Sequence, residues 1–299
     1  MGAHSVPFIF LPMDLFLLEY WGIPNIQAET PEKRNRSRSS TIKKGKKAMA
    51  KYIAPAPIDN PNREWPSRAI TESPVWVSVD LRDGNQALPN PMNPPQKLEY
   101  FELLCAIGFK EIEVGFPSAS KEDFDFTRRL IEEELVPEDV TVMVLTQCRP
   151  HLIARTFEAI KDTKRVIFHA YCATSELHMS RVFGMTPEKT LEMVVRAIRQ
   201  IRELADAMPE TDIRLEFSPE EFTDTDSDFA LQVCEAVFEE WGKATEEKPL
   251  IFNLPATVER RTPDQYADMI EFFCRRFSQR RKILVSVHAH NDQGMAVAA

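Results

Sequence analysis

The feature that most constrains the fold is a repeat of short apolar segments, rich in β-branched residues, separated by segments with helical periodicity. The predicted strands are residues 75–79, 111–114, 140–145, 165–168, 213–217, 250–253 and 283–287. Runs that are apolar throughout are typical of parallel strands covered on both faces. Helix-start signals such as Pro94-Pro95 and Thr186-Pro187 lie between strands. The alternation predicts an α/β protein with a parallel sheet.

Polar residues follow one predicted strand after another. They are Arg82, Asp83, Gln147, His169, Ser218, Glu220, Asn253, Thr257, His288, His290, Asn291 and Asp292. Such convergence at the carboxyl ends of strands is typical of a (β/α)8 TIM barrel, and the absence of a Gly-x-Gly-x-x-Gly or Walker pattern disfavours an open nucleotide-binding sheet. Residues 288–299 leave no room for another helix and strand. We therefore expect an incomplete barrel of about seven strands, either truncated, open or completed by a partner.

The composition divides the chain at about residue 48. Residues 33–47 are basic and rich in serine, so residues 1–48 are interpreted as a disordered tail, an organellar transit segment, or sequence upstream of a true start at Met49. Residues 49–299 are predicted to form the partial catalytic barrel. The net charge of −9 disfavours a nucleic-acid partner, and no segment is long and apolar enough to span a membrane. The five scattered cysteines are interpreted as buried thiols in a reducing compartment.

The strongest chemical motif is His288-Ala289-His290-Asn291-Asp292 after the last predicted strand. Residues i and i+2 of a strand face the same way, so His288 and His290 can bind one metal ion from one side. Asp83, at another strand end, is the best candidate for a third ligand. Two imidazoles and a carboxylate with open positions suit a catalytic divalent metal rather than a closed structural site.

Two further groups could serve a substrate. A turn at Gly84 would direct Asp83 to the metal and Arg82 over the substrate, where a guanidinium stabilises an oxygen that gains negative charge. A structural Arg82–Asp83 pair is the alternative. In the other group, His169, Ser218 and Thr257 can bind a carboxylate and Glu220 can move a proton. Taken singly, each of these four residues is more often a satisfied polar group than a catalyst.

A family resemblance supports these assignments. The stretch Leu81-Arg82-Asp83-Gly84-Asn85-Gln86, followed after ten residues by Lys97, resembles the first signature of the 2-isopropylmalate synthase and homocitrate synthase family. Residues 285–298 resemble the second signature. The segments LTQCRP (145–150), EFSPEEFT (216–223) and FNLPATVE (252–259) are similar to those of the leucine-pathway members. The resemblance runs from about Lys51 to Ala299.

The resemblance implies an acyltransferase of the HMG-CoA lyase-like barrel type. It would condense acetyl-CoA with 2-oxoisovalerate to give 2-isopropylmalate and CoA in leucine biosynthesis. It further implies that a divalent ion (Mg, Mn or Zn) is held by Asp83, His288 and His290. Arg82 and Glu220 would be catalytic, and His169, Ser218 and Thr257 would line the keto-acid pocket.

Other interpretations remain open from the sequence. They are a homocitrate or citramalate synthase, a lyase that runs the reverse cleavage, and a truncated product without catalytic activity. We expect small-molecule substrates only, a homodimer in the full-length form, and a cytoplasmic location unless residues 1–48 are a transit segment.

Overall fold

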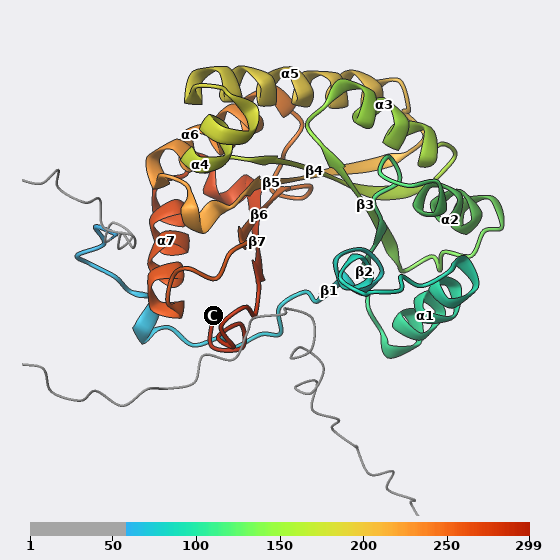
Figure 1. Ribbon diagram of the computed structural model, residues 1–299, viewed down its shortest axis with the longest axis horizontal. Coiled ribbons are helices and arrows are strands. Elements are labelled where there is room, and N and C mark those ends of the chain that lie inside the picture. The colour runs from blue at the N-terminus through green and yellow to red at the C-terminus, as the bar shows by residue number, and fades with distance from the viewer. Residues whose placement is uncertain (1–57) are drawn as a thin grey trace, which may run out of the picture. The chain divides into compact units, whose positions relative to one another are not determined.

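Seven parallel strands form one curved sheet in which each strand pairs with its neighbour in sequence (Figure 1). The computed structural model describes residues 58–299, so the interpretations of residues 1–48 and of Met49 lie outside the described residues. The strands are β1 (Val77–Ser78), β2 (Glu111–Gly115), β3 (Thr141–Gln147), β4 (Arg165–Ala173), β5 (Asp212–Glu220), β6 (Leu250–Ala256) and β7 (Ile283–Ala289). The prediction of an α/β barrel architecture with about seven strands is confirmed.

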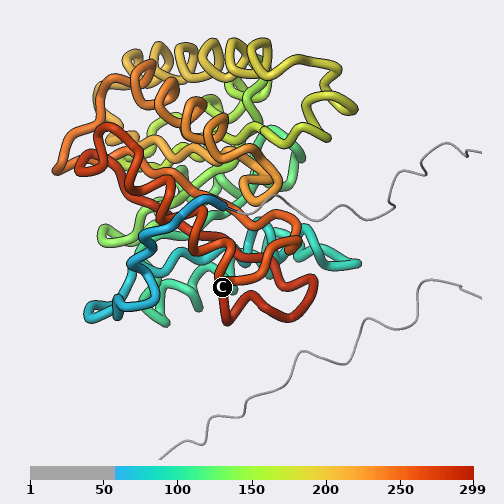
Figure 2. The backbone as a smooth tube through the Cα atoms, turned by 90° about the vertical axis from the view of Figure 1, so that its left-hand side faces the viewer, coloured from blue at the N-terminus to red at the C-terminus, as the bar shows by residue number. Residues whose placement is uncertain are grey.

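Helices cover the outer face of this sheet, as Figure 1 shows. They are α1 (Pro94–Ile107), α2 (Lys121–Glu132), α3 (Pro150–Ala159), α4 (Glu176–His178), α5 (Pro187–Asp206), α6 (Ser227–Trp241) and α7 (Pro263–Arg276). Figure 2 shows α5 and α6 running side by side, in yellow and orange. The sequence analysis assigned no helix to the segment of α3, which begins with Pro150 but whose preceding residue, Arg149, provides no side-chain cap. A helix without a capping Ser, Thr, Asp or Asn lacks the clearest start signal.

Three central strands extend further toward their carboxyl ends than predicted. β4 continues to Ala173, β5 to Glu220 and β6 to Ala256. Polar residues such as His169 and Ser218 stay within the strands because their hydrogen-bond partners lie on neighbouring strands. The side chains of the candidate site are therefore held by the sheet rather than by loops.

The sheet has two different packing faces. Most of the core lies between sheet and helices, where Phe252 of β6 packs against Phe273 and Phe277 with ring centroids 5.9 and 5.4 Å apart. On the concave face a smaller apolar cluster consists of Met143, Ile167 and Ile251. Polar residues occupy this concave face at the carboxyl ends of the strands, so the apolar cluster forms the floor of the site.

The outer edges of β1 and β7 are unpaired within residues 58–299. Leu284 and Val287 of β7 are 47% and 58% exposed. Ahead of β1, the described chain packs against α7, where Arg63 and Trp65 donate hydrogen bonds to Asp268 over 2.6 and 2.8 Å (Figure 1, blue segment). Among the described helices, none combines the length and apolar character needed to cross a bilayer.

Candidate metal centre and active site

Asp83, His288 and His290 come together at the carboxyl ends of the first and last strands. The Nε2 atoms of His288 and His290 lie 3.0 and 3.6 Å from the same oxygen, Oδ2 of Asp83. One donor atom from each side chain falls within 4.8 Å of the others. Donors bound at about 2.1 Å to a single ion can be at most about 4.2 Å apart, so a small adjustment would let one ion contact all three. The donor set and its spacing fit a divalent metal.

Local structure explains how Asp83 reaches this position. After β1 the chain enters a helical turn at once (Asp80–Gly84), in which the N–H of Asp83 donates to the carbonyl of Val79 over 2.8 Å. The predicted turn at Gly84 is wrong in its position, because the turn begins four residues earlier. Hydrogen bonds from His288 and then His290 hold the pKa of Asp83 well below its usual range. The carboxylate is therefore ionised, as a metal ligand must be.

Arg82 lies beside this cluster and is clamped by two carboxylates. Its guanidinium contacts Glu113 of β2 through Nε at 3.0 Å and Nη2 at 2.8 Å, and Asp83 through Nη1 at 3.0 Å. The Arg82–Asp83 pair was the structural alternative to a substrate role for Arg82, and it is present. The sequence did not indicate that Glu113 also fixes the guanidinium. A guanidinium held in one orientation is a preorganised donor for a developing oxyanion.

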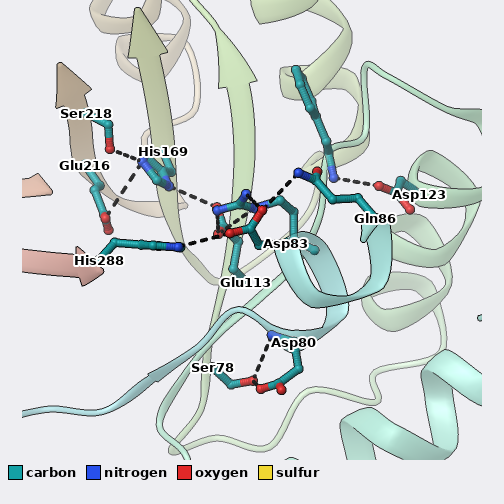
Figure 3. A network of polar contacts seen from close by, with 12 residues as sticks. Ser78, Asp80, Asp83, Gln86, Glu113, Asp123, His169, Glu216, Ser218 and His288 are labelled. Atoms are coloured by element: carbon teal, nitrogen blue, oxygen red, sulfur yellow. Dashed lines mark hydrogen bonds and ion pairs between the residues drawn. The ribbon is translucent and has the colours of Figure 1, made fainter. Parts of the chain in front are cut away.

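A buried polar row lies next to Glu113 on the concave face (Figure 3). His169 of β4 contacts Glu113 Oε1 through Nδ1 at 2.9 Å and Ser218 Oγ through Nε2 at 2.7 Å. Glu216 of β5 lies 3.9 Å from Nε2. Although burial alone would raise the pKa of Glu113, Arg82 and His169 lower it to about 2. Burial opposes the charging of His169, but the carboxylates of Glu216 and Glu113 outweigh it and raise its pKa.

Glu220 and Thr257 are placed at the next two strand ends. Glu220 ends β5, and burial, reinforced by Glu221, raises its pKa. A carboxyl group with a raised pKa is suited to proton transfer near neutral pH. The hydroxyl of Thr257, just after β6, accepts a hydrogen bond of 3.0 Å from the N–H of Glu221, which ties the two strand ends together.

All eight predicted site residues line one cavity of ≈ 280 Å³. They are Arg82, Asp83, His169, Ser218, Glu220, Thr257, His288 and His290. The wall is completed by Gln86, Phe116, Leu145, Tyr171, Asn253 and Pro255, to which the sequence analysis gave no role. Aromatic and aliphatic side chains among them give the cavity an apolar part beside the polar cluster.

Other polar residues at strand ends have structural partners instead. Asp292 Oδ2 accepts a hydrogen bond from the N–H of Glu259, and Asn291 Oδ1 accepts one from that of Ala296. Glu113 and Glu216 are the important omissions, because both are buried below the cavity. Each occupies an inward position on a strand otherwise rich in apolar residues, and a charged residue in such a strand is the signal that could have revealed them.

Glu216 is expected to make the free energy of unfolding fall as the pH rises from about 4.5 to about 7. Burial, opposed by His169, raises its pKa from 4.5 to about 7. Within this window the folded chain binds more protons than the unfolded chain, so stability decreases with pH. Glu216→Gln removes this loss. Urea denaturation at a series of pH values should therefore show that the free energy of unfolding of the variant, relative to that of the wild type, increases with pH. A pH-independent difference would contradict the assignment.

Lys97, the last residue of the first signature, is buried in α1 and pairs with Asp123 of α2. The other oxygen of Asp123 accepts the N–H of Phe116 over 2.8 Å, which positions the cavity residue Phe116. A Cβ added to Gly115 would lie 3.0 Å from the Asp123 carboxylate, so this close approach requires glycine.

Asp123→Ala is expected to lower the free energy of unfolding by about 3–5 kcal/mol, because it leaves the buried ammonium of Lys97 without a partner. Urea denaturation monitored by tryptophan fluorescence measures the effect. Asp125→Ala is the matched control, since Asp125 pairs with exposed Lys121 on the same helix. Equal losses for both variants would show that the buried pair has no special importance.

Comparison with known proteins agrees with this arrangement of strands. Residues 73–299 match the HMGL-like family model. This chain belongs to the HMGL-like family. The match covers every described strand of the sheet and all eight predicted site residues.

Within the HMGL-like family, the chain is similar to proteins named 2-isopropylmalate synthase. It is 53% identical over 238 residues to that of Acetoanaerobium sticklandii, covering 80% of this chain and 42% of the relative. It is 52% identical over 246 residues to that of Schizosaccharomyces pombe, covering 81% of this chain and 42% of the relative. The chain thus spans less than half the length of these relatives. The resemblance to 2-isopropylmalate synthases is confirmed.

A solved structure supports the HMGL-like fold. The HMG-CoA lyase of Bacillus subtilis superposes with a TM-score of 0.55 at 18% sequence identity, over 75% of this chain and 71% of the lyase. At this identity the likeness concerns the barrel architecture alone.

Proposed function

We propose that residues 49–299 form a catalytic barrel that condenses acetyl-CoA with 2-oxoisovalerate to give 2-isopropylmalate and CoA. The observation that carries the proposal is the convergence of Asp83, His288 and His290 on one side of the cavity. The similarity to proteins named 2-isopropylmalate synthase supports the choice of reaction.

Asp83, His288 and His290 would hold a divalent ion, and the donor set accepts Mg²⁺, Mn²⁺ or Zn²⁺. When bound, such an ion supplies Lewis-acid polarisation of the keto-acid carbonyl. The two imidazoles stand on adjacent sides of the carboxylate, with ring centroids 5.1 Å apart. Their approach from one strand leaves the cavity side of the cluster for substrate.

The chain's own groups account for substrate orientation. Ser218 and Thr257 would bind the carboxylate of the keto acid through their hydroxyls, with His169 behind Ser218 fixing the hydroxyl direction. Leu145, Tyr171 and Pro255 provide apolar wall for the branched alkyl group. This combination of a few polar groups with apolar wall is typical of small-molecule sites.

Arg82 and Glu220 would carry the charge and proton movements. Glu220, with its raised pKa, would accept a methyl proton from the acetyl thioester. The resulting carbanion equivalent attacks the ketone carbon, and the guanidinium of Arg82 stabilises the negative charge that develops on the ketone oxygen. Glu113 would keep Arg82 in place throughout, through its two contacts with the guanidinium. Hydrolysis of the thioester then releases CoA.

A panel of 2-oxo acids tests the proposal. The purified chain, with acetyl-CoA and a divalent ion, is assayed by free-thiol release against 2-oxoisovalerate, pyruvate and 2-oxoglutarate. The fastest release is expected with 2-oxoisovalerate. Preference for pyruvate or 2-oxoglutarate would favour a citramalate or homocitrate synthase. Thermal unfolding in parallel should show a cooperative transition that shifts upward with the ion and again with 2-oxoisovalerate. No shift with either would argue for a protein without this activity.

A further inference from the structure

We propose that Cys148 and Cys172, with Met185 and Met193, form a binding site for one monovalent copper ion, Cu(I). The four sulfur-bearing side chains line a second cavity of ≈ 280 Å³. The cavity lies beside the ends of β3 and β4, and none of its lining residues lines the cavity of the candidate active site. Thiolate and thioether sulfurs are the soft ligands that select Cu(I).

The sheet register makes the two cysteines lateral neighbours. Gln147 of β3 pairs with Tyr171 of β4, and the next N–H, that of Cys148, donates to the carbonyl of Tyr171 over 3.0 Å. Continuation of this parallel ladder places Cys148 beside Cys172. Both thiols are buried in the core cluster between sheet and helices, whereas His169 and Tyr171 line the cavity on the concave face.

Neighbouring strand positions suit a bridging ion better than a disulfide. Adjacent strands are about 4.8 Å apart, whereas a disulfide requires Cβ atoms at about 3.8 Å. Two sulfurs that bind one ion at the zinc–thiolate length of about 2.3 Å can be up to about 4.6 Å apart. Both cysteines are free thiols, as are the other three, of which Cys105 and Cys274 are only half-buried. The prediction that all five thiols are buried is wrong for those two, which lie on helices.

The charge of the ion-loaded site can be balanced within the chain. Burial raises the pKa of both Cys148 and Cys172, so the thiols are protonated before an ion binds. Binding of Cu(I) would break two S–H bonds, form two Cu–S bonds and release two protons to solvent, leaving one net negative charge. Arg149 lines the cavity and opposes the effects of burial and of the Glu220 carboxylate on the pKa of Cys172, so its guanidinium would offset this charge.

The methionines complete the cavity from the helical side. Met185 precedes α5 and Met193 lies in its second turn, and both are half-buried. Thioethers carry no charge and need no deprotonation, so they can add to a two-thiolate site without further electrostatic cost. The adaptable methionine side chains also allow the cavity to contract around an ion.

Competition with a chromophoric Cu(I) chelator tests the proposal under anaerobic, reducing conditions. The wild-type chain should withhold one Cu(I) per chain from the chelator. The double substitution Cys148→Ala, Cys172→Ala should release it, and Met193→Leu should weaken retention while preserving side-chain volume. Cys234→Ala is the matched control, since Cys234 is a fully buried thiol of α6 outside the cavity. Wild-type chain that yields all its copper, or equal loss in the Cys234 variant, would overturn the proposal.

Two further measurements keep the test decisive if the double variant folds poorly. X-ray absorption of the copper-loaded wild type should show sulfur neighbours only, whereas imidazole scattering would place the ion at His288 and His290 instead. The substitution His288→Ala should leave copper retention unchanged, because that side chain belongs to the other cavity. Loss of copper in this variant would likewise overturn the proposal.

Discussion

Replacing Asp83 by alanine is expected to abolish metal-dependent turnover and to remove the rise in unfolding temperature that a divalent ion produces. The carboxylate contacts both imidazoles, so its loss leaves His288 and His290 with no carboxylate opposite them. Asp83 is the only carboxylate among the three candidate ligands, so the substituted site should no longer hold a divalent ion. Isothermal titration of the purified chain with Mn²⁺ or Zn²⁺ measures the loss directly, and thiol release measures the loss of turnover.

Asp80→Ala is the matched control for this substitution. Asp80 lies on the same helical turn, but its carboxylate contacts Ser78 at 2.6 Å rather than the imidazoles. The Asp80 variant should bind the ion like the wild type. His290→Ala is expected to behave like Asp83→Ala. Full turnover by either ligand variant, after chelation and readdition of metal, would disprove the assignment of these ligands.

Arg82→Ala is expected to lower turnover by roughly a hundredfold, as the loss of an oxyanion donor does in other enzymes. The guanidinium is nearly buried and is fixed by Glu113, so water cannot replace it with the same orientation. Steady-state thiol release with 2-oxoisovalerate measures the effect on kcat.

Arg82→Lys keeps the positive charge but loses the forked contact with Glu113, so it should recover only part of the activity. The control is Arg214→Ala, because Arg214 contacts Glu111 at 2.9 Å and does not line the cavity. Unchanged kcat in the Arg82→Ala variant would exclude a role for this guanidinium in the reaction.

The strands and the convergence of the site could be predicted from sequence because both depend on local pattern. Apolar runs indicated all seven strands, and the spacing of His288 and His290 indicated a shared face. The rule that carboxyl ends of parallel strands meet then brought Asp83 to the same place. These inferences required no knowledge of side-chain packing.

Tertiary contacts determined what the sequence could not reveal. Glu113 is held by Arg82 and His169, which are 31 and 56 residues away, so no local pattern marks its importance. The ends of β4, β5 and β6 were predicted too early because polar residues usually mark strand ends. The turn after β1 was misplaced because it requires no glycine conformation, and the carbonyl of Val79 accepts three successive N–H groups.

The sequential strand order has a consequence for synthesis on the ribosome. Each newly emerged strand finds its partner already made, so the sheet can be extended by one unit at a time from β1 onward. The Asp83–His288 contact is an exception, because it joins the end of β1 to β7. The candidate metal centre can therefore assemble only after β7 has been made, and nascent chains that stop earlier carry a sheet in which Asp83 lacks its two imidazole neighbours.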